Sequence, residues 1–289
     1  MSPELPGRTA LVLGVGGMTG IAWELGLLTG LADAGPDLTD ADLVVGTSAG
    51  SVVGAQVTSS TPLRELYDRQ LEPPSTEQAA RAGPWVLAGL ALAMLRARGD
   101  VEAFGRSVGA FALKRTRAGR TPTLAARLEV ISSRLPVHTW PARDLRVTAV
   151  DAMTGGITVL DPSSGVDLVT AVAASCAVPG VYPPVDIAGR PHIDGGVRSG
   201  ANVDIAAGLE SVVVLAPLPR GFGPIASPGR QAERLGVDAI VVSPDQAAVA
   251  AIGKNVLDPA ARSASARAGY AQASTVLPDV RQAWDRAHD

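Results

Sequence analysis

A short apolar run passes directly into a glycine-flanked serine at Leu43-Val44-Val45-Gly46-Thr47-Ser48-Ala49-Gly50. Small residues with helical spacing follow it. An earlier segment has the same form, because the apolar residues 9–13 lead into a glycine-rich loop at 14–20 and then into a helical pattern over 21–34. Two successive strand–turn–helix units predict a parallel sheet with helices on both faces.

The middle of the chain has a different character. Helical patterns dominate residues 62–141, and pairs such as Pro73-Pro74 and Gly83-Pro84 interrupt them. Strand patterns return further along, at residues 145–150, 157–160, 212–215 and 239–242. Residues 259–287 have the pattern of one long amphipathic helix. We therefore predict a single α/β domain over residues 1–289, with three α/β/α layers, a mostly parallel central sheet and a helical insert at about 62–141.

Composition restricts the class of protein. The chain has 289 residues, of which 46% are hydrophobic and 18% charged, so it is long and apolar enough for a sizeable core. A net charge of −3 gives no basic face for nucleic acid, and we predict no nucleic-acid partner. The only cysteine, Cys176, excludes an intramolecular disulfide, and no Cys/His cluster has the spacing of a zinc site.

The location of the protein is also addressed by the sequence. The first residues lack the basic and apolar segments of a signal peptide. The longest apolar run, residues 85–95, is shorter than the roughly 20 residues that cross a bilayer. We expect a cytoplasmic protein, either soluble or peripheral to a membrane.

The predicted insert carries its own charge. Between Arg96 and Arg143 there are ten Lys/Arg and three Asp/Glu, although the whole chain is slightly acidic. This basic helical insert is either a solvated helical face or a lid that meets anionic lipid, with the apolar residues 85–95 adding contact. The second interpretation predicts peripheral membrane contact.

Ser48 is the candidate nucleophile. A serine hydroxyl needs exposure and a neighbouring base before it attacks a carbonyl carbon. A sharp turn between a strand and a helix gives that exposure, and flanking glycines leave room for the bend. The alternative is that Ser48 only caps the helix that follows it.

The loop at residues 14–20 follows the first predicted strand. In a parallel sheet it lies at the same edge as Ser48, where its backbone N–H groups can stabilise a developing oxyanion. The alternative is a nucleotide-binding loop. The G-x-G-x-x-G pattern fits only loosely, no P-loop lysine follows, and Asp33 and Asp37 are poorly placed to hold a ribose.

A base for Ser48 is harder to find. None of the three histidines, His138, His192 and His288, stands where an ordinary triad needs one. Asp194 remains, followed by Gly195-Gly196 in a turn that presents the carboxylate without crowding. Taken alone, Asp-Gly-Gly is simply a favourable turn sequence.

Together these elements resemble the patatin-like phospholipases, in which a glycine-rich oxyanion loop, a G-x-S-x-G turn and a later Asp-Gly-Gly turn follow one another. They stand here at residues 15–20, 46–50 and 194–196. Residues 147–155 and 173–184 also look like the family. The resemblance implies a lipid acyl hydrolase, in which Ser48 and Asp194 form a catalytic dyad and an acyl-enzyme is formed. It implies that the amides of Gly16, Gly17 and Met18 hold the oxyanion, that the substrate is a lipid or other acyl ester, and that no cofactor or metal takes part.

Two positions depart from the family pattern. Val15 stands where the loop usually has glycine, and Thr19 where it usually has Arg or Lys. The loss of that cation removes one partner for a charged head group. Both departures support an alternative, a catalytically impaired binding or regulatory protein on the same fold. Intact Ser48 and Asp194 favour the hydrolase.

Overall fold

A computed structural model describes residues 8–73, 80, 82–236 and 238–286. The strands in this part of the chain are β1 (Thr9–Leu13), β2 (Leu43–Thr47), β3 (Asp144–Asp151), β4 (Ile157–Leu160), β5 (Val185–Ile187), β6 (Arg190–Asp194), β7 (Ser211–Leu215) and β8 (Asp238–Val242). The α-helices are α1 (Gly17–Ala34), α2 (Ala49–Val57), α3 (Leu63–Leu71), α4 (Pro84–Ala97), α5 (Val101–Arg117), α6 (Leu124–Arg134), α7 (Leu168–Ser175), α8 (Pro228–Leu235), α9 (Gln246–Ile252) and α10 (Arg262–Arg286). Short 3₁₀ helices include η3 (Gly195–Val197), η4 (Val203–Ala206) and η5 (Pro259–Ala261).

The strands form one sheet in the order β5-β6-β3-β2-β1-β7-β8, with β4 paired to β3. The pairs from β3 through β2, β1 and β7 to β8 are parallel, whereas β4 and β6 run antiparallel to β3. The predicted α/β fold with a mostly parallel sheet is therefore confirmed. The buried apolar strands explain it, since residues 9–13 of β1 have no exposed position and must be covered on both faces.

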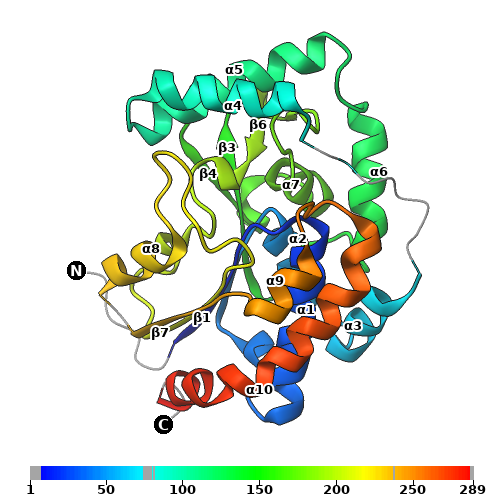
Figure 1. Cartoon of the computed structure of the whole chain (residues 1–289), viewed down its shortest axis with the longest axis vertical. Coiled ribbons are helices and arrows are strands. Elements are labelled where there is room, and N and C mark those ends of the chain that lie inside the picture. Colours follow the sequence, from blue (N-terminus) through cyan, green and yellow to red (C-terminus); the bar gives the residue numbers. More distant parts are fainter. Residues whose placement is uncertain (1–7, 74–79, 81, 237, 287–289) are drawn as a thin grey trace.

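Helices cover both faces of the sheet. On one face, β1, β2 and β3 pack through Leu11, Val44 and Leu145 against α1, α2, α7 and α10. On the other face, alternate residues such as Val12 and Val45 pack against η4 and α8. Further along this second face, α4 and α5 cover β3 and β6. Figure 1 shows α4 and α5 side by side at one end of the molecule, and α1 and α10 packed together at the other.

One feature of the sheet decides the geometry of the site. Thr47 at the end of β2 pairs with Thr148 of β3, and Asp194 at the end of β6 pairs with the next residue, Ala149. β4 pairs with residues 147–150 of β3. Within this stretch, β2 pairs with residues 147 and 148 and β6 with residues 149 and 150, so both lie on the edge of β3 opposite β4. The two strands therefore approach each other end to end, and the turns after Thr47 and Asp194 meet.

The structure also corrects some element boundaries. α1 begins at Gly17, ahead of the expected start at residue 21, because the glycine loop itself supplies the first helical turn. The hairpin of β5 and β6 and helices α7, α8 and α9 were not predicted. β5 has only three residues, too few for a periodic pattern, and Ala188 and Gly189 make the turn with positive φ angles.

Candidate active site

Ser48 lies in the sharp turn between β2 and α2. Its backbone has φ 54° and ψ −113°, a strained conformation for a residue with a side chain. The Ser48 N–H donates to Ser175 Oγ (2.9 Å), and the Ser48 carbonyl accepts from Ser51 Oγ (2.7 Å). Although Ser48 stands at the N-cap position of α2, its side chain makes no capping bond, so the capping interpretation is wrong.

The two glycines of the pentapeptide are required by close packing. A Cβ on Gly46 would lie 2.6 Å from the Gly50 carbonyl oxygen, and one on Gly50 would lie 2.1 Å from the Leu13 carbonyl oxygen. The Gly50 N–H also donates to the Gly14 carbonyl oxygen (3.0 Å). The serine turn and the β1–α1 loop are thus fixed against each other.

Asp194 ends β6 and is 5% exposed. Its Oδ1 accepts a hydrogen bond from the Gly196 N–H (2.8 Å), so the interpretation as a turn residue is also correct. Burial raises the pKa of the Asp194 carboxyl to about 6, while hydrogen bonds from the Ser48 side chain and from Gly196, and the charge of Arg127, act in the opposite direction. The candidate nucleophile and the candidate base are therefore close enough for the Ser48 hydroxyl to act on the Asp194 carboxyl.

The β1–α1 loop lines the same cavity as Ser48 and Asp194. Gly16 stands at the N-cap of α1 and Gly17, with φ +60°, is its first residue. The N–H groups of a first helical turn have no partner inside the helix, and they lie at its positive end. Gly16, Gly17, Met18, Ser48 and Asp194 all line one cavity of about 840 Å³.

The rest of the cavity is mostly apolar, with three cationic side chains. Apolar lining comes from α4, α5 and the loop after β7, in Leu87, Leu90, Phe104, Leu218 and Phe222. The cations come from α6 and the segment after α9, in Arg127, Arg134 and Lys254. The arrangement combines a neighbouring serine and aspartate, a helix N-terminus and a large apolar space, which is what acyl transfer from a long apolar chain needs.

A comparison with models of protein families assigns this chain to a family. The model for patatin-like phospholipases matches residues 11–207, which contain the loop, Ser48 and Asp194. The chain belongs to the patatin-like phospholipase family. Membership places the protein among hydrolases that act on lipid esters.

Solved structures of similar fold include VipD from Legionella pneumophila and the type III effector protein ExoU. VipD is 12% identical, with a TM-score of 0.48, over 96% of this chain and 67% of that one. ExoU is 19% identical, with a TM-score of 0.40, over 98% of this chain and 54% of that one. The chain therefore spans between about half and two thirds of these two proteins. No curated protein matches it.

This patatin-like protein accommodates both departures from the family pattern. The Val15 N–H donates to the Gly200 carbonyl oxygen (2.8 Å), so that amide is bonded to the segment between η3 and η4. Thr19 is fully buried, and its hydroxyl donates to the Val256 carbonyl oxygen (3.3 Å). Neither side chain interrupts the contact between Ser48 and Asp194.

The sequence patterns did not identify Glu24 as a residue of the site, and they did not predict that Arg127 is buried beside it. Glu24 is fully buried on α1, and its Oε1 accepts from the Gly14 N–H (3.1 Å), at the base of the oxyanion loop. Burial raises the pKa of the Glu24 carboxyl well above its ordinary value. Arg127 is 4% exposed, with its guanidinium carbon 3.7 Å from the centroid of the Tyr182 ring, although it belongs to the segment for which a solvated face was one interpretation. The one signal in the sequence that could have identified either residue is a single charged residue at a position where the helical pattern predicts burial.

The histidines lie outside the Ser–Asp contact. His192 is buried beside β4, with Nε2 3.0 Å from Thr158 Oγ1 and Nδ1 2.9 Å from the Arg190 carbonyl oxygen. His138 is exposed, and its Nε2 lies 3.0 Å from the Ser132 carbonyl oxygen. His288 falls outside the described residues. Within the part of the chain that is described, no helix is both long and apolar enough to cross a bilayer.

Proposed function

We propose that the protein is a lipid acyl hydrolase that works through a Ser48–Asp194 dyad and an acyl-enzyme. The observation that carries the proposal is that Ser48 and the buried Asp194 line one apolar cavity, close enough together for the Ser48 hydroxyl to lower the pKa of the Asp194 carboxyl. Asp194 takes the Ser48 proton as the serine oxygen attacks the ester carbonyl. Asp194 gives this proton to the leaving alcohol, then takes a proton from the water that attacks the acyl-serine, and returns it to the Ser48 oxygen as the fatty acid is released.

The amides of Gly16, Gly17 and Met18 are proposed to hold the oxyanion of each tetrahedral intermediate. They belong to the start of α1, where the helix dipole favours negative charge, and they line the cavity that contains Ser48. A base with a pKa of about 6 is ionised at neutral pH and still basic enough to share the serine proton.

The cavity supports a lipid as the ester. Its volume of about 840 Å³ is large enough for a long acyl chain, and its apolar lining suits one. Arg127, Arg134 and Lys254 supply positive charge at the same cavity and offset the absence of a cation at Thr19. This charge favours esters with an anionic head group, such as phospholipids.

We also propose that α4 meets the lipid surface from which the substrate comes. One side of this helix is buried on α5 through Ala93 and Ala97, yet Trp85 and Leu95 are 77% and 76% exposed. A helix that carries apolar residues all round is normally buried on every side, in a protein core or in a membrane. Leu87 of the same helix lines the cavity, so this surface continues into the site.

The dyad is tested with a fluorophosphonate probe and p-nitrophenyl esters on the wild type, Ser48→Ala and Asp194→Ala. We expect the wild type to label and to turn over ester, Ser48→Ala to do neither, and Asp194→Ala to lose turnover by about a thousand-fold or more. A folded wild type that neither labels nor turns over ester would contradict the proposal and favour a binding protein on this fold.

A further inference from the structure

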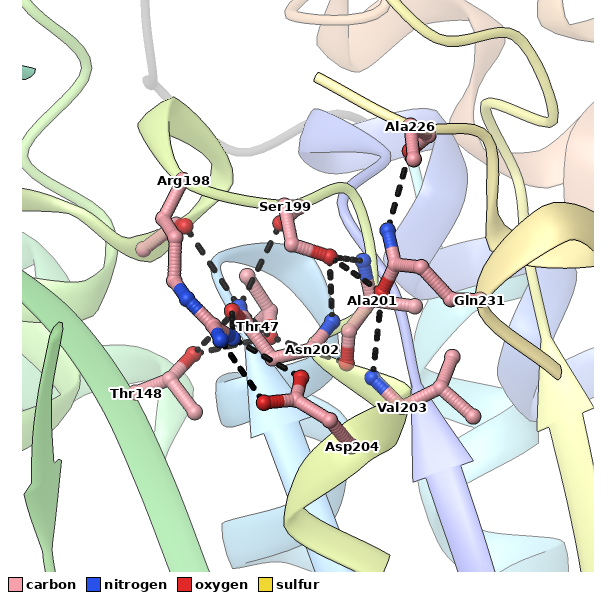
Figure 2. Close-up of polar contacts among 11 residues, drawn as sticks. Thr47, Thr148, Arg198, Ser199, Ala201, Asn202, Val203, Asp204, Ala226 and Gln231 are labelled. Atoms are coloured by element: carbon pink, nitrogen blue, oxygen red, sulfur yellow. Dashed lines mark hydrogen bonds and ion pairs between the residues drawn. The ribbon is translucent and has the colours of Figure 1, made fainter. Parts of the chain in front are cut away.

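We propose that Asn202 is a positioning residue, whose side-chain amide fixes the residue before Ser48 and the residue after Asp194 relative to each other. The inference rests on the proposed Ser–Asp chemistry. Asn202 lies in the segment between η3 and η4 and is fully buried. Figure 2 shows it at the centre of a group of polar side chains from β2, β3 and the segment after Asp194.

The donors of Asn202 reach three separate parts of the site. Its Nδ2 lies 3.1 Å from Thr47 Oγ1, 3.2 Å from Thr148 Oγ1 and 3.4 Å from the Gly195 carbonyl oxygen. Thr47 directly precedes Ser48, and Gly195 directly follows Asp194. β2 and β6 both pair with β3 and meet end to end there, and the Asn202 side chain bonds to the turn after each strand.

The orientation of the amide is fixed by charge. Asn202 Oδ1 accepts from Arg198 Nη1 (2.8 Å), and Arg198 also forms an ion pair with Asp204 (2.7 Å). The guanidinium can only donate, so the amide oxygen faces it and the amide nitrogen faces the threonines. The Asn202 N–H donates to Ser199 Oγ (2.7 Å), which fixes the backbone as well.

The backbone of Asn202 adds a second requirement. Its φ of 52° and ψ of 46° lie in the left-handed region, which side chains other than Asn and Asp rarely adopt. Glycine adopts it without strain, so Asn202→Gly removes the amide and leaves the chain path intact. Asn202→Asp keeps the shape and the acceptor for Arg198 but removes both donors.

Gln272 provides a matched control. It is also a buried carboxamide that joins separate elements, since Oε1 accepts from Trp23 Nε1 (3.0 Å) and Nε2 donates to the Ser243 carbonyl oxygen (2.7 Å). Its partners belong to α1 and to the segment after β8. Gln272→Glu removes a donor from a buried network in the same way as Asn202→Asp, without contact to the serine or aspartate turn.

The test compares kcat and KM of the wild type, Asn202→Asp, Asn202→Gly and Gln272→Glu on two p-nitrophenyl esters of different length, with thermal unfolding of each. We expect both Asn202 variants to lose roughly 10-fold to 100-fold in kcat on both esters, with KM changed by less than about two-fold, because a small displacement of reacting groups slows chemistry without changing binding. Gln272→Glu is expected to lose stability and keep kcat. If Asn202→Gly is folded and keeps kcat within about two-fold, Asn202 is merely structural and the inference is wrong. A wild type without any turnover would instead overturn the proposed function and this inference with it.

Discussion

The Asp194 carboxyl is buried, and burial disfavours its ionised form. Its carboxyl pKa of about 6, raised from 3.8 by burial, means that ionisation destabilises the folded protein by roughly 3 kcal/mol. The folded pKa is above the unfolded one, so stability is greatest below pH 4 for this group and falls as pH rises from 4 to 6. We expect Asp194→Asn to raise the free energy of unfolding at pH 8 by up to about 3 kcal/mol and to lose this advantage near pH 4.

The wild type should gain activity as pH rises through about 6, because Asp194 must be ionised to act as the base.

Asp204→Asn is the control for the Asp194→Asn experiment, measured by denaturant unfolding at both pH values. Burial raises the pKa of Asp204, but the ion pair with Arg198 outweighs it and the pKa is lowered. This variant is therefore expected to lose stability at pH 8, the opposite sign. An Asp194→Asn variant that is no more stable than the wild type at pH 8 would show that the carboxylate is solvated or better compensated than its surroundings indicate.

Residues differ in how far the sequence alone identifies them. The sharp turn at Ser48 was predictable because the strand, the serine and both glycines are contiguous and the turn is local. Asp194 was recognisable only from the order of three separate motifs, since its own surroundings indicate nothing more than a turn. The contacts of Asn202 and Arg127 could not be predicted, because their partners come from other strands and helices. The order of the strands in the sheet brings these partners together, and no local sequence pattern indicates that order.

At the scale of elements, the β1–α1 turn depends on a glycine that another segment crowds. A Cβ on Gly17 would lie 2.5 Å from the Val256 carbonyl oxygen, and the residue has a φ of +60°. Gly119 has a similar φ of +64°, but no described atom lies within 4 Å of its Cβ position. Gly119→Ala should cost about 1 kcal/mol of stability and keep activity, because only backbone strain is added.

Gly17→Ala adds a steric clash at the proposed oxyanion site. We expect it to lower kcat by about a hundred-fold, as the loss of an oxyanion donor does, and to cost more stability than Gly119→Ala. Thermal unfolding and p-nitrophenyl ester kinetics on the two variants measure both effects. Equal behaviour of the two variants would mean that the loop has room to adjust and that its geometry does not limit the reaction.

The elements that the sequence predicted best are those with complete local signals. The buried strands β1 and β3 and the long helix α10 were predicted within a few residues, because an apolar run between turn residues, or a long amphipathic pattern, needs no partner to be recognised. The hairpin of β5 and β6 was not predicted. Pro191 within β6 argues against a strand, and it is tolerated because its pairing with Asp186 lies near the end of a short edge hairpin.

At the scale of the whole molecule, exposed apolar and basic side chains gather on and just after α4, the helix whose Leu87 and Leu90 line the cavity. Leu92 of α4 is 46% exposed, and Phe222 beside the cavity is 48% exposed. Arg96 near the end of α4 and Arg98 directly after it are exposed. An apolar surface flanked by cations binds a lipid interface that carries negative charge, and its contact with the cavity would deliver an acyl chain directly to Ser48.

This surface predicts which vesicles the protein binds. Co-sedimentation should be stronger with vesicles that contain anionic lipid than with neutral ones, and Trp85→Ala combined with Leu95→Ala should weaken it about ten-fold or more, since each side chain would be buried in the interface. Val249, which is 58% exposed on α9, provides the control substitution Val249→Ala. Turnover of a water-soluble p-nitrophenyl ester should be unchanged in all three proteins, because these side chains lie outside the dyad and the oxyanion loop. Equal binding to neutral and anionic vesicles would contradict the electrostatic part of the proposal, and undiminished binding by the double variant would move the lipid contact away from α4.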